Sequence, residues 1–163
     1  YRVVENDYAG ELQVERLKEE HIPAGPIYGR LKAGEKVELP DGRVIDGQDY
    51  LGEKKRGRIV TILGDTRQTP SILGLAQNAD VLIHESTFGR DEAQLAFNYH
   101  HSTNMQAAKI AKQAEVKQLF LTHISARYVG VKALQLEKDA HKVFENTKLA
   151  NDFDTYMVPF SHK

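Results

Sequence analysis

Three short apolar runs decide the fold, and they read IVTILGDT at residues 59–66, VLIHEST at residues 81–87 and LFLTHIS at residues 119–125. Runs of β-branched and aliphatic residues, separated by helical patterns, are typical of buried strands in an α/β sheet. Each run ends in polar residues. Because ligands bind such sheets where the strands end, we expect these polar residues to converge although they lie far apart in the sequence.

Helical patterns follow the three runs. Thr69 and Pro70 predict the N-cap and first turn of a helix that extends to about residue 78. Thr103 and Gln106 predict a capping box at the start of a helix over residues 103–114. Two further helices are expected over residues 90–99 and 131–144. Strands that alternate with helices indicate an α/β layered fold.

The two ends of the chain add strand patterns. Residues 1–5 alternate like a strand, and residues 155–160 are a plausible last strand. The chain begins with Tyr1 rather than Met, so we expect a fragment or a processed chain.

Residues 6–56 differ from the rest because they are charged, turn-rich and only weakly periodic. Gly25 and Pro26 permit a helix to start at Pro26, and a Pro-Asp-Gly turn at residues 40–42 predicts a hairpin. We therefore expect a core strand at 1–5, an excursion at 6–56 and the main core at 57–163. The basic run at residues 53–57 is either a solvated turn or a polyanion contact.

Composition limits the possible functions. The net charge of −1 excludes a globally basic nucleic-acid binder but not a local basic site. Without cysteine, neither a disulfide nor a thiolate metal site is possible, so any metal must be held by His, Asp or Glu. No apolar run approaches about 18 residues, so we expect a soluble, cytoplasmic protein with no membrane partner.

Four polar residues near the strand ends are candidates for chemistry. Asp65 and His123 follow two predicted strands, and together they form half of a plausible zinc site. Each alone is also an ordinary turn residue. His101 precedes a capped helix whose dipole disfavours imidazolium, and a neighbouring Glu85 would offset this and let His101 exchange a proton.

The remaining candidates are weaker. Arg127 is either a surface cation or a clamp for phosphate, which guanidinium binds with two hydrogen bonds. His84 is either a hydrogen-bonded core residue or a group that supports the site. We expect His21, His141 and His162 to be solvated.

Four motifs follow one another along the chain: GDTR at residues 64–67, HESTF at 84–88, HST at 101–103 and LTHISARY at 121–128. In this order they resemble the motifs of the ribonuclease Z family. The chain resembles the C-terminal half of this tRNA 3′-processing endonuclease of the metallo-β-lactamase superfamily. The resemblance implies half of an αββα sandwich: a mixed sheet flanked by helices, with a protruding tRNA-binding arm at residues 6–56 that includes Gly25 and Pro26.

The resemblance also implies roles for single residues. Asp65 matches an aspartate that bridges two zinc ions, and His123 matches a histidine ligand. His101 matches the proposed proton donor to the leaving group, with Glu85 in the motif that supports it. Arg127 falls where the family contacts RNA phosphate. The implied reaction is two-zinc hydrolysis that removes the 3′ trailer from precursor tRNA.

The chain departs from the family in one large respect. The His-x-His-x-Asp-His motif, which supplies most zinc ligands, is absent. We therefore expect the isolated chain to bind zinc partially or not at all and to be inactive without the N-terminal half of the same protein. The implied partners are that half, precursor tRNA and a second copy in a homodimer. The competing hypotheses are a glyoxalase II-like thioesterase of the same superfamily and a noncatalytic module that binds tRNA or dimerises.

Overall fold

The computed structural model describes residues 1–160. It divides them into two compact units, residues 1–5 with 58–160 and residues 6–57. Each unit has its own hydrophobic core, and each is described by itself below.

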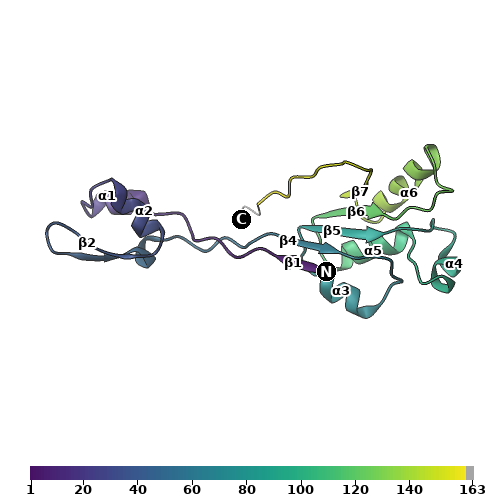
Figure 1. Cartoon of the computed structure of the whole chain (residues 1–163), viewed down its shortest axis with the longest axis horizontal. Helices are drawn as coiled ribbons and strands as arrows, with labels where there is room; N and C mark the ends of the chain where they lie inside the picture. The colour runs from purple at the N-terminus through teal and green to yellow at the C-terminus, as the bar shows by residue number, and fades with distance from the viewer. Residues whose placement is uncertain (161–163) are drawn as a thin grey trace. The chain divides into compact units, whose positions relative to one another are not determined.

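The larger unit is built on a five-stranded mixed sheet with the order β1-β4-β5-β6-β7 (Figure 1). Strand β1 (Arg2–Val4) pairs antiparallel with β4 (Ile59–Ile62). Strands β5 (Val81–Glu85), β6 (Gln118–Thr122) and β7 (Thr147–Leu149) continue the sheet in parallel with β4. The three strands predicted from the apolar runs and the strand predicted at the start of the chain are therefore confirmed.

The larger unit also contains α3 (Pro70–Ala76), α4 (Ala93–Asn98), α5 (Asn104–Gln113) and α6 (Val131–His141). Helix α6 contacts β7, and α3 packs against α5. Helix α5 contacts both β5 and β6, and its small alanine side chains are fully buried there. Small side chains let the helix backbone approach the sheet closely. Leu82, Leu119 and Leu121 fill the core from the strands and have no exposed surface.

The helix starts were predicted with mixed success. The capping box of α5 is confirmed, since Thr103 Oγ1 accepts from Gln106 N at 3.2 Å and Gln106 Oε1 accepts from Thr103 N at 2.9 Å. Helix α3 begins at Pro70 as expected, but the Thr69 side chain makes no capping bond and lies 2.9 Å from Ser71 Oγ instead. Helix α4 is shorter than the predicted 90–99.

The prediction of a last strand at residues 155–160 is wrong. The sheet position beside β6 is taken by β7, which the sequence analysis did not identify. The later segment lies against the sheet instead: the Tyr156 ring meets Phe120 edge-on at 5.0 Å between centroids, and Arg58 Nη1 donates to Val158 O at 3.2 Å. Together with the sheet, this segment lines a cavity of about 510 Å³.

The smaller unit contains α1 (Val14–Glu19), α2 (Pro26–Lys32), β2 (Lys36–Glu38), β3 (Val44–Asp46) and a short 3₁₀ helix, η1 (Gly47–Tyr50). The predicted hairpin is confirmed by the antiparallel pairing of β2 with β3. The unit has a small core of its own, formed by Leu17, Ile22, Leu31, Val37, Leu39, Ile45 and Tyr50.

Among residues 1–160, no helix has both the length and the apolar character that crossing a membrane requires.

Candidate active site

The ends of three neighbouring strands meet at one edge of the sheet. Glu85 is the last residue of β5, and Asp65 and His123 lie just past β4 and β6. The parallel register pairs Ile62 with Ile83 and Glu85 with Thr122, which brings the three strand ends side by side. The structure therefore brings these residues together, as the sequence pattern suggests.

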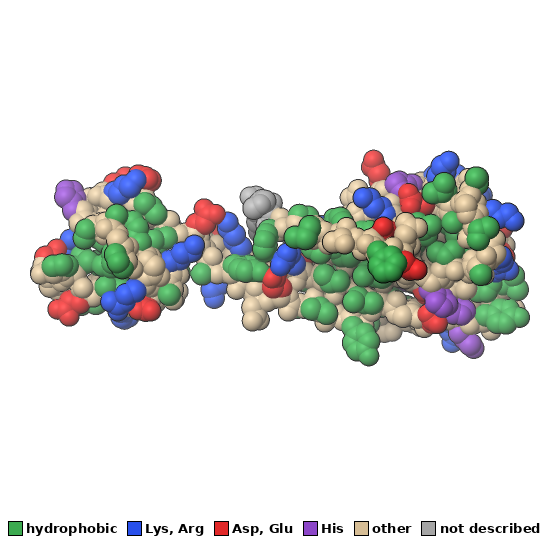
Figure 2. Space-filling model, turned by 45° about the horizontal axis from the view of Figure 1, so that its top comes forward, with side chains coloured by type: hydrophobic (Ala, Val, Ile, Leu, Met, Phe, Trp, Pro, Cys, Tyr) green, Lys and Arg blue, Asp and Glu red, His purple; other side chains and the backbone are tan. Residues whose placement is uncertain are grey.

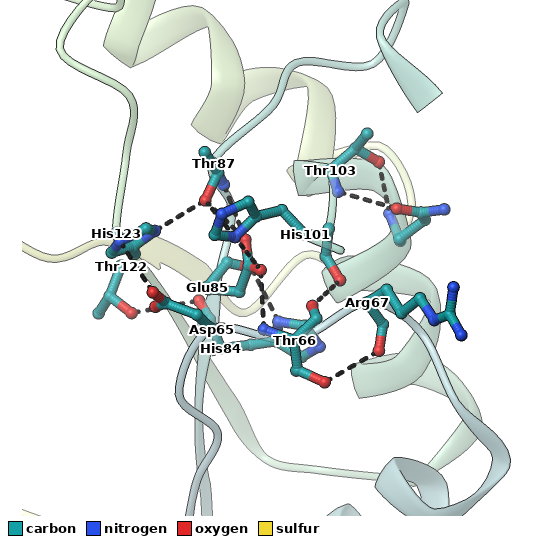
Figure 3. Close-up of polar contacts among 12 residues, drawn as sticks. Asp65, Thr66, Arg67, His84, Glu85, Thr87, His101, Thr103, Thr122 and His123 are labelled. Atoms are coloured by element: carbon teal, nitrogen blue, oxygen red, sulfur yellow. Dashed lines mark hydrogen bonds and ion pairs between the residues drawn. The ribbon is translucent and has the colours of Figure 1, made fainter. Parts of the chain in front are cut away.

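Asp65, His101 and His123 form a cluster at this edge (Figure 3). One ligand atom from each residue lies within 4.8 Å of the others. Nε2 of His123 is 3.3 Å from Oδ2 of Asp65, and the rings of His101 and His123 stack with centroids 5.3 Å apart. Figure 2 shows histidine side chains gathered next to an acidic side chain on the surface of this unit.

The donor set of this cluster suits zinc. Zinc binds imidazole nitrogen and carboxylate oxygen at about 2.0–2.2 Å, which places two tetrahedral ligand atoms roughly 3.4 Å apart. The 3.3 Å between Asp65 and His123 matches that spacing. Both residues are exposed, so a metal ion and its ligands from solvent have access. His101 also lies within ligand range, although the sequence assigned it to proton transfer.

Glu85 is a buried carboxylate that supports this cluster through hydrogen bonds. Its side chain is 1% exposed. Oε1 accepts from Thr66 N at 3.0 Å and lies 2.8 Å from Nδ1 of His101. Oε2 accepts from the Thr87 N–H at 3.0 Å and from the Thr87 hydroxyl at 2.8 Å. Both carboxylate oxygens are thus fully engaged.

These contacts keep Glu85 ionised. Burial opposes the charge, but hydrogen bonds from Thr87 and from the backbone of Ser102 and Thr66 outweigh it and lower the pKa of Glu85 below its usual range. An ionised carboxylate accepts hydrogen bonds only, so Nδ1 of His101 carries the proton between them.

The fold fixes His101 from two directions. Its backbone N–H donates to Ala96 O at 2.8 Å, which ties it to the end of α4, and the capped start of α5 follows two residues later. The buried Phe88 lies beside the ring, with centroids 6.0 Å apart. The imidazole is therefore held between Glu85 and the open edge of the site.

Arg127 is exposed but not free. Its guanidinium lies 3.3 Å from Glu92 and over the ring of Phe88, at 5.0 Å from the centroid. Glu92 Oε2 and the Tyr128 hydroxyl both accept from Gly89 N, and Tyr128 also donates to Glu92. These contacts fasten the loop after β6, which carries His123, to the turn before α4.

Of the other histidines considered in the sequence analysis, one is buried and two lie at the surface. His84 is fully buried and its Nδ1–H donates to Glu85 O at 2.7 Å, so it is a core residue next to the site. His21 is exposed, and His141 lies 3.7 Å from Glu137 at the surface. His162 lies outside the described residues.

Gly25 and Pro26 belong to the smaller unit, where they start α2. Gly25 has a φ of 154° and Pro26 is the first helical residue. In the same unit, Lys55 of the basic run pairs with Glu11 at 2.5 Å.

Sequence reasoning missed two residues that build the site. Thr87 Oγ1 lies 2.8 Å from both Glu85 and His123, and Ser102 Oγ donates to Thr66 O at 2.7 Å. Both residues belong to motifs that the sequence analysis identified. Thr87 could have been found from its spacing, because a hydroxyl two residues beyond a buried carboxylate can hydrogen-bond back to that carboxylate.

Comparison with known proteins identifies relatives along the whole chain. The chain is 65% identical over all 163 residues to "Ribonuclease Z" of Ligilactobacillus salivarius and 60% identical over 163 residues to that of Lactiplantibacillus plantarum. These matches cover 51% and 52% of the two relatives, so the chain spans about half of their length. No protein-family model matches the chain.

Solved structures show the same fold. Human tRNase Z, short form, superposes with a TM-score of 0.51 at 30% identity, over 72% of this chain and 37% of that one. The metallo-β-lactamase fold protein YhfI of Bacillus subtilis gives a TM-score of 0.52 at 28% identity, over 71% of this chain and 44% of that one. The resemblance stated from the four motifs and the expected fold, a mixed sheet flanked by helices, are confirmed.

Proposed function

From this similarity to ribonuclease Z over all of its 163 residues, we propose that the chain supplies about half of a metal-dependent endoribonuclease that removes the 3′ trailer from precursor tRNA. One observation carries the proposal. Asp65, His101 and His123 lie within 4.8 Å of one another beside the ionised Glu85, in a chain whose relatives are named ribonuclease Z.

The metal would be held by Asp65 and His123, with zinc as the ion that their donor atoms favour. When bound, zinc supplies a Lewis acid for the phosphodiester and lowers the pKa of a water nucleophile toward about 7. Structural and catalytic zinc sites need three or four protein ligands per ion. Two or three donors are too few for two ions, so the isolated chain is expected to be inactive and to need the remainder of the protein.

His101 would act on the leaving oxygen. Its Nδ1 faces Glu85 at 2.8 Å, which leaves Nε2 as the ring nitrogen that can hand over a proton. Glu85 faces the Nδ1 of His101, and the buried hydrogen bonds of Glu85 keep the imidazole in one orientation. A stable orientation matters because proton transfer requires hydrogen-bond distance to the departing oxygen.

RNA would be held outside this centre. Arg127 carries a guanidinium at the rim of the site and is proposed to bind a phosphate, with Glu92 keeping it in position until RNA arrives. Residues 6–56, including Gly25 and Pro26, are proposed as the tRNA-binding arm. The homodimer and the cytoplasmic location remain predictions.

The test is cleavage of a precursor tRNA with a 3′ trailer by the chain alone and by the chain mixed with the N-terminal half of its L. salivarius relative. Release of the trailer only in the mixture supports the proposal. Binding without cleavage in both reactions would favour a noncatalytic tRNA-binding module, and hydrolysis of a thioester instead would favour the thioesterase.

His101→Ala separates proton transfer from metal binding in the complemented enzyme. We expect a loss of 10²- to 10⁴-fold in cleavage rate, the usual contribution of a general acid, with unchanged zinc content. Metal analysis of the purified variant checks this. Loss of zinc from His101→Ala would make His101 a ligand instead.

A further inference from the structure

The Thr87 hydroxyl joins the two histidines of the site to one carboxylate. Thr87 Oγ1 lies 2.8 Å from Oε2 of Glu85, 2.8 Å from Nδ1 of His123 and 3.3 Å from Nδ1 of His101 (Figure 3). Its own N–H donates to the same Glu85 oxygen at 3.0 Å. The backbone therefore holds Thr87 against Glu85 independently of its side chain.

A proton count across these contacts gives a definite arrangement. A threonine hydroxyl has one hydrogen to donate and two lone pairs to accept with. The hydroxyl donates its hydrogen to Oε2 of Glu85, which also accepts the Thr87 N–H. The lone pairs of Thr87 Oγ1 then face His123, and Nδ1 of His123 must be the donor.

This arrangement determines which nitrogen of His123 is available. A neutral imidazole carries its hydrogen on one ring nitrogen and a lone pair on the other. With the hydrogen on Nδ1, the lone pair is on Nε2. Oδ2 of Asp65 also faces Nε2, but at 3.3 Å, a longer contact than the 2.8 Å hydrogen bond at Nδ1. His101 is held in the same way, since its Nδ1 faces Glu85 at 2.8 Å.

We propose that Thr87 is a positioning residue that relays the charge of Glu85 to His123, fixing its Nδ1–H tautomer and aiming the Nε2 lone pair at the metal position beside Asp65. The relay lets one buried carboxylate orient two imidazoles, His101 directly and His123 through the hydroxyl. This proposal deepens the proposed function, on which its catalytic meaning rests, but the tautomer is a property of the chain without metal.

Two substitutions isolate the hydroxyl. Thr87→Val keeps the shape of the side chain and removes the hydroxyl, while Thr87→Ser keeps the hydroxyl. Both retain the backbone N–H that donates to Glu85. Thr61→Val is the matched control, because the Thr61 hydroxyl is also hydrogen-bonded, at 2.9 Å to Leu75 O, but touches no histidine.

The first readout is the long-range ¹H–¹⁵N correlation spectrum of the imidazole nitrogens in the metal-free chain, recorded at a pH where the rings are neutral. His123→Asn assigns the His123 signals by their disappearance. We expect Nδ1–H for His123 in the wild type, in Thr87→Ser and in Thr61→Val, and a mixture of tautomers in Thr87→Val. Nε2–H in the wild type, or an unchanged spectrum in Thr87→Val, would overturn the proposal.

The second readout is metal affinity, measured by titrating Co²⁺ into the same proteins and following visible absorption. Loss of a hydrogen-bond partner behind a metal-binding histidine typically weakens the affinity 10- to 100-fold. We expect that loss in Thr87→Val and recovery in Thr87→Ser. Equal affinity in all variants would contradict the relay.

These results are independent of the cleavage assay. If the tautomer depends on Thr87 but the chain never supports trailer removal, the relay is supported and the proposed function is refuted. If Thr87→Val still supports cleavage and shows no change in tautomer or metal affinity, the proposed function is supported and the relay is refuted.

Discussion

Replacing the buried Glu85 by glutamine is the sharpest structural test of the site, because the change removes a charge and keeps the size. The carboxylate accepts hydrogen bonds from Thr66 N, Thr87 N and the Thr87 hydroxyl and faces Nδ1 of His101. A glutamine has one acceptor oxygen, so its amide group must face either the Thr66 or the Thr87 N–H. One backbone donor is then left without a partner.

The magnitude follows from these contacts. An unsatisfied buried donor costs about 1–3 kcal/mol, and the bonds that remain lose roughly 1 kcal/mol each when the acceptor is no longer charged. Part of this is recovered because the Thr87 hydroxyl can rotate and accept from the new amide. We expect Glu85→Gln to lower the free energy of unfolding by about 3 kcal/mol.

Urea denaturation followed by circular dichroism measures this difference, with an unchanged m value as evidence that the unfolding reaction is the same. Glu145→Gln, which alters an exposed carboxylate, is the control and should change the stability by less than about 0.5 kcal/mol. Equal stability of Glu85→Gln and Glu145→Gln would refute the account of Glu85.

The pH dependence gives an independent check on Glu85. Its pKa in the folded chain is lowered from the ordinary value of 4.5, so the stabilisation from ionisation is fully present above pH 4.5. It is lost as the pH falls through the folded pKa. The stability difference between wild type and Glu85→Gln should therefore shrink as the pH falls below 4.5.

Two further predictions concern neighbouring residues. Burial lowers the pKa of His84 from 6.5, so the unfolded chain binds its proton more readily and the free energy of unfolding falls as the pH drops below 6.5. His84→Gln should flatten that part of the stability profile, and an unchanged slope would contradict the assignment. Arg127→Ala should lower the free energy of unfolding by less than about 1 kcal/mol, because its ion pair with Glu92 is exposed. The same change should weaken the binding of precursor tRNA and reduce the slope of the logarithm of the binding constant against the logarithm of the salt concentration by about one phosphate contact. Filter binding over a salt series measures this, and an unaltered slope would exclude the phosphate contact.

The strands that carry the site were predictable because their apolar runs are long and continuous. Ile59, Leu82 and Leu119 each lie in a run that is buried on folding, and the run lengths and β-branched content favour strands over helices. The capping box of α5 was equally readable, since Thr103 and Gln106 interact within one turn. Local signals thus predicted both the layers of the fold and the position of His101.

The last strand was mispredicted because the decisive interaction is not local. Strand β7 has only three residues, and it becomes a strand by pairing with β6. Residues 155–160 alternate more convincingly, but with the place beside β6 already taken, Tyr156 packs on the face of the sheet. Competition between two segments for one sheet edge depends on tertiary packing, which periodicity does not contain.

The candidate site was predicted as a set of residues but not as a network. Strand ends and motifs identified Asp65, Glu85, His101 and His123. The role of Thr87 depends on a hydroxyl placed between residues that are 2 and 36 positions away in the sequence, and only the folded chain brings them to 2.8 Å. Such a contact follows no helix or strand periodicity, so the sequence pattern could not predict it.

The central claim is that this chain contributes part, and not all, of a two-zinc centre. Zinc per chain, measured by atomic emission after gel filtration, tests it most directly when the chain is purified alone and together with the N-terminal half of its relative. We predict fewer than two zinc ions for the chain alone, two for the mixture, and a reduced content in both preparations of Asp65→Asn. Two tightly bound zinc ions in the chain alone, or a mixture that binds no more zinc than the chain, would contradict the claim.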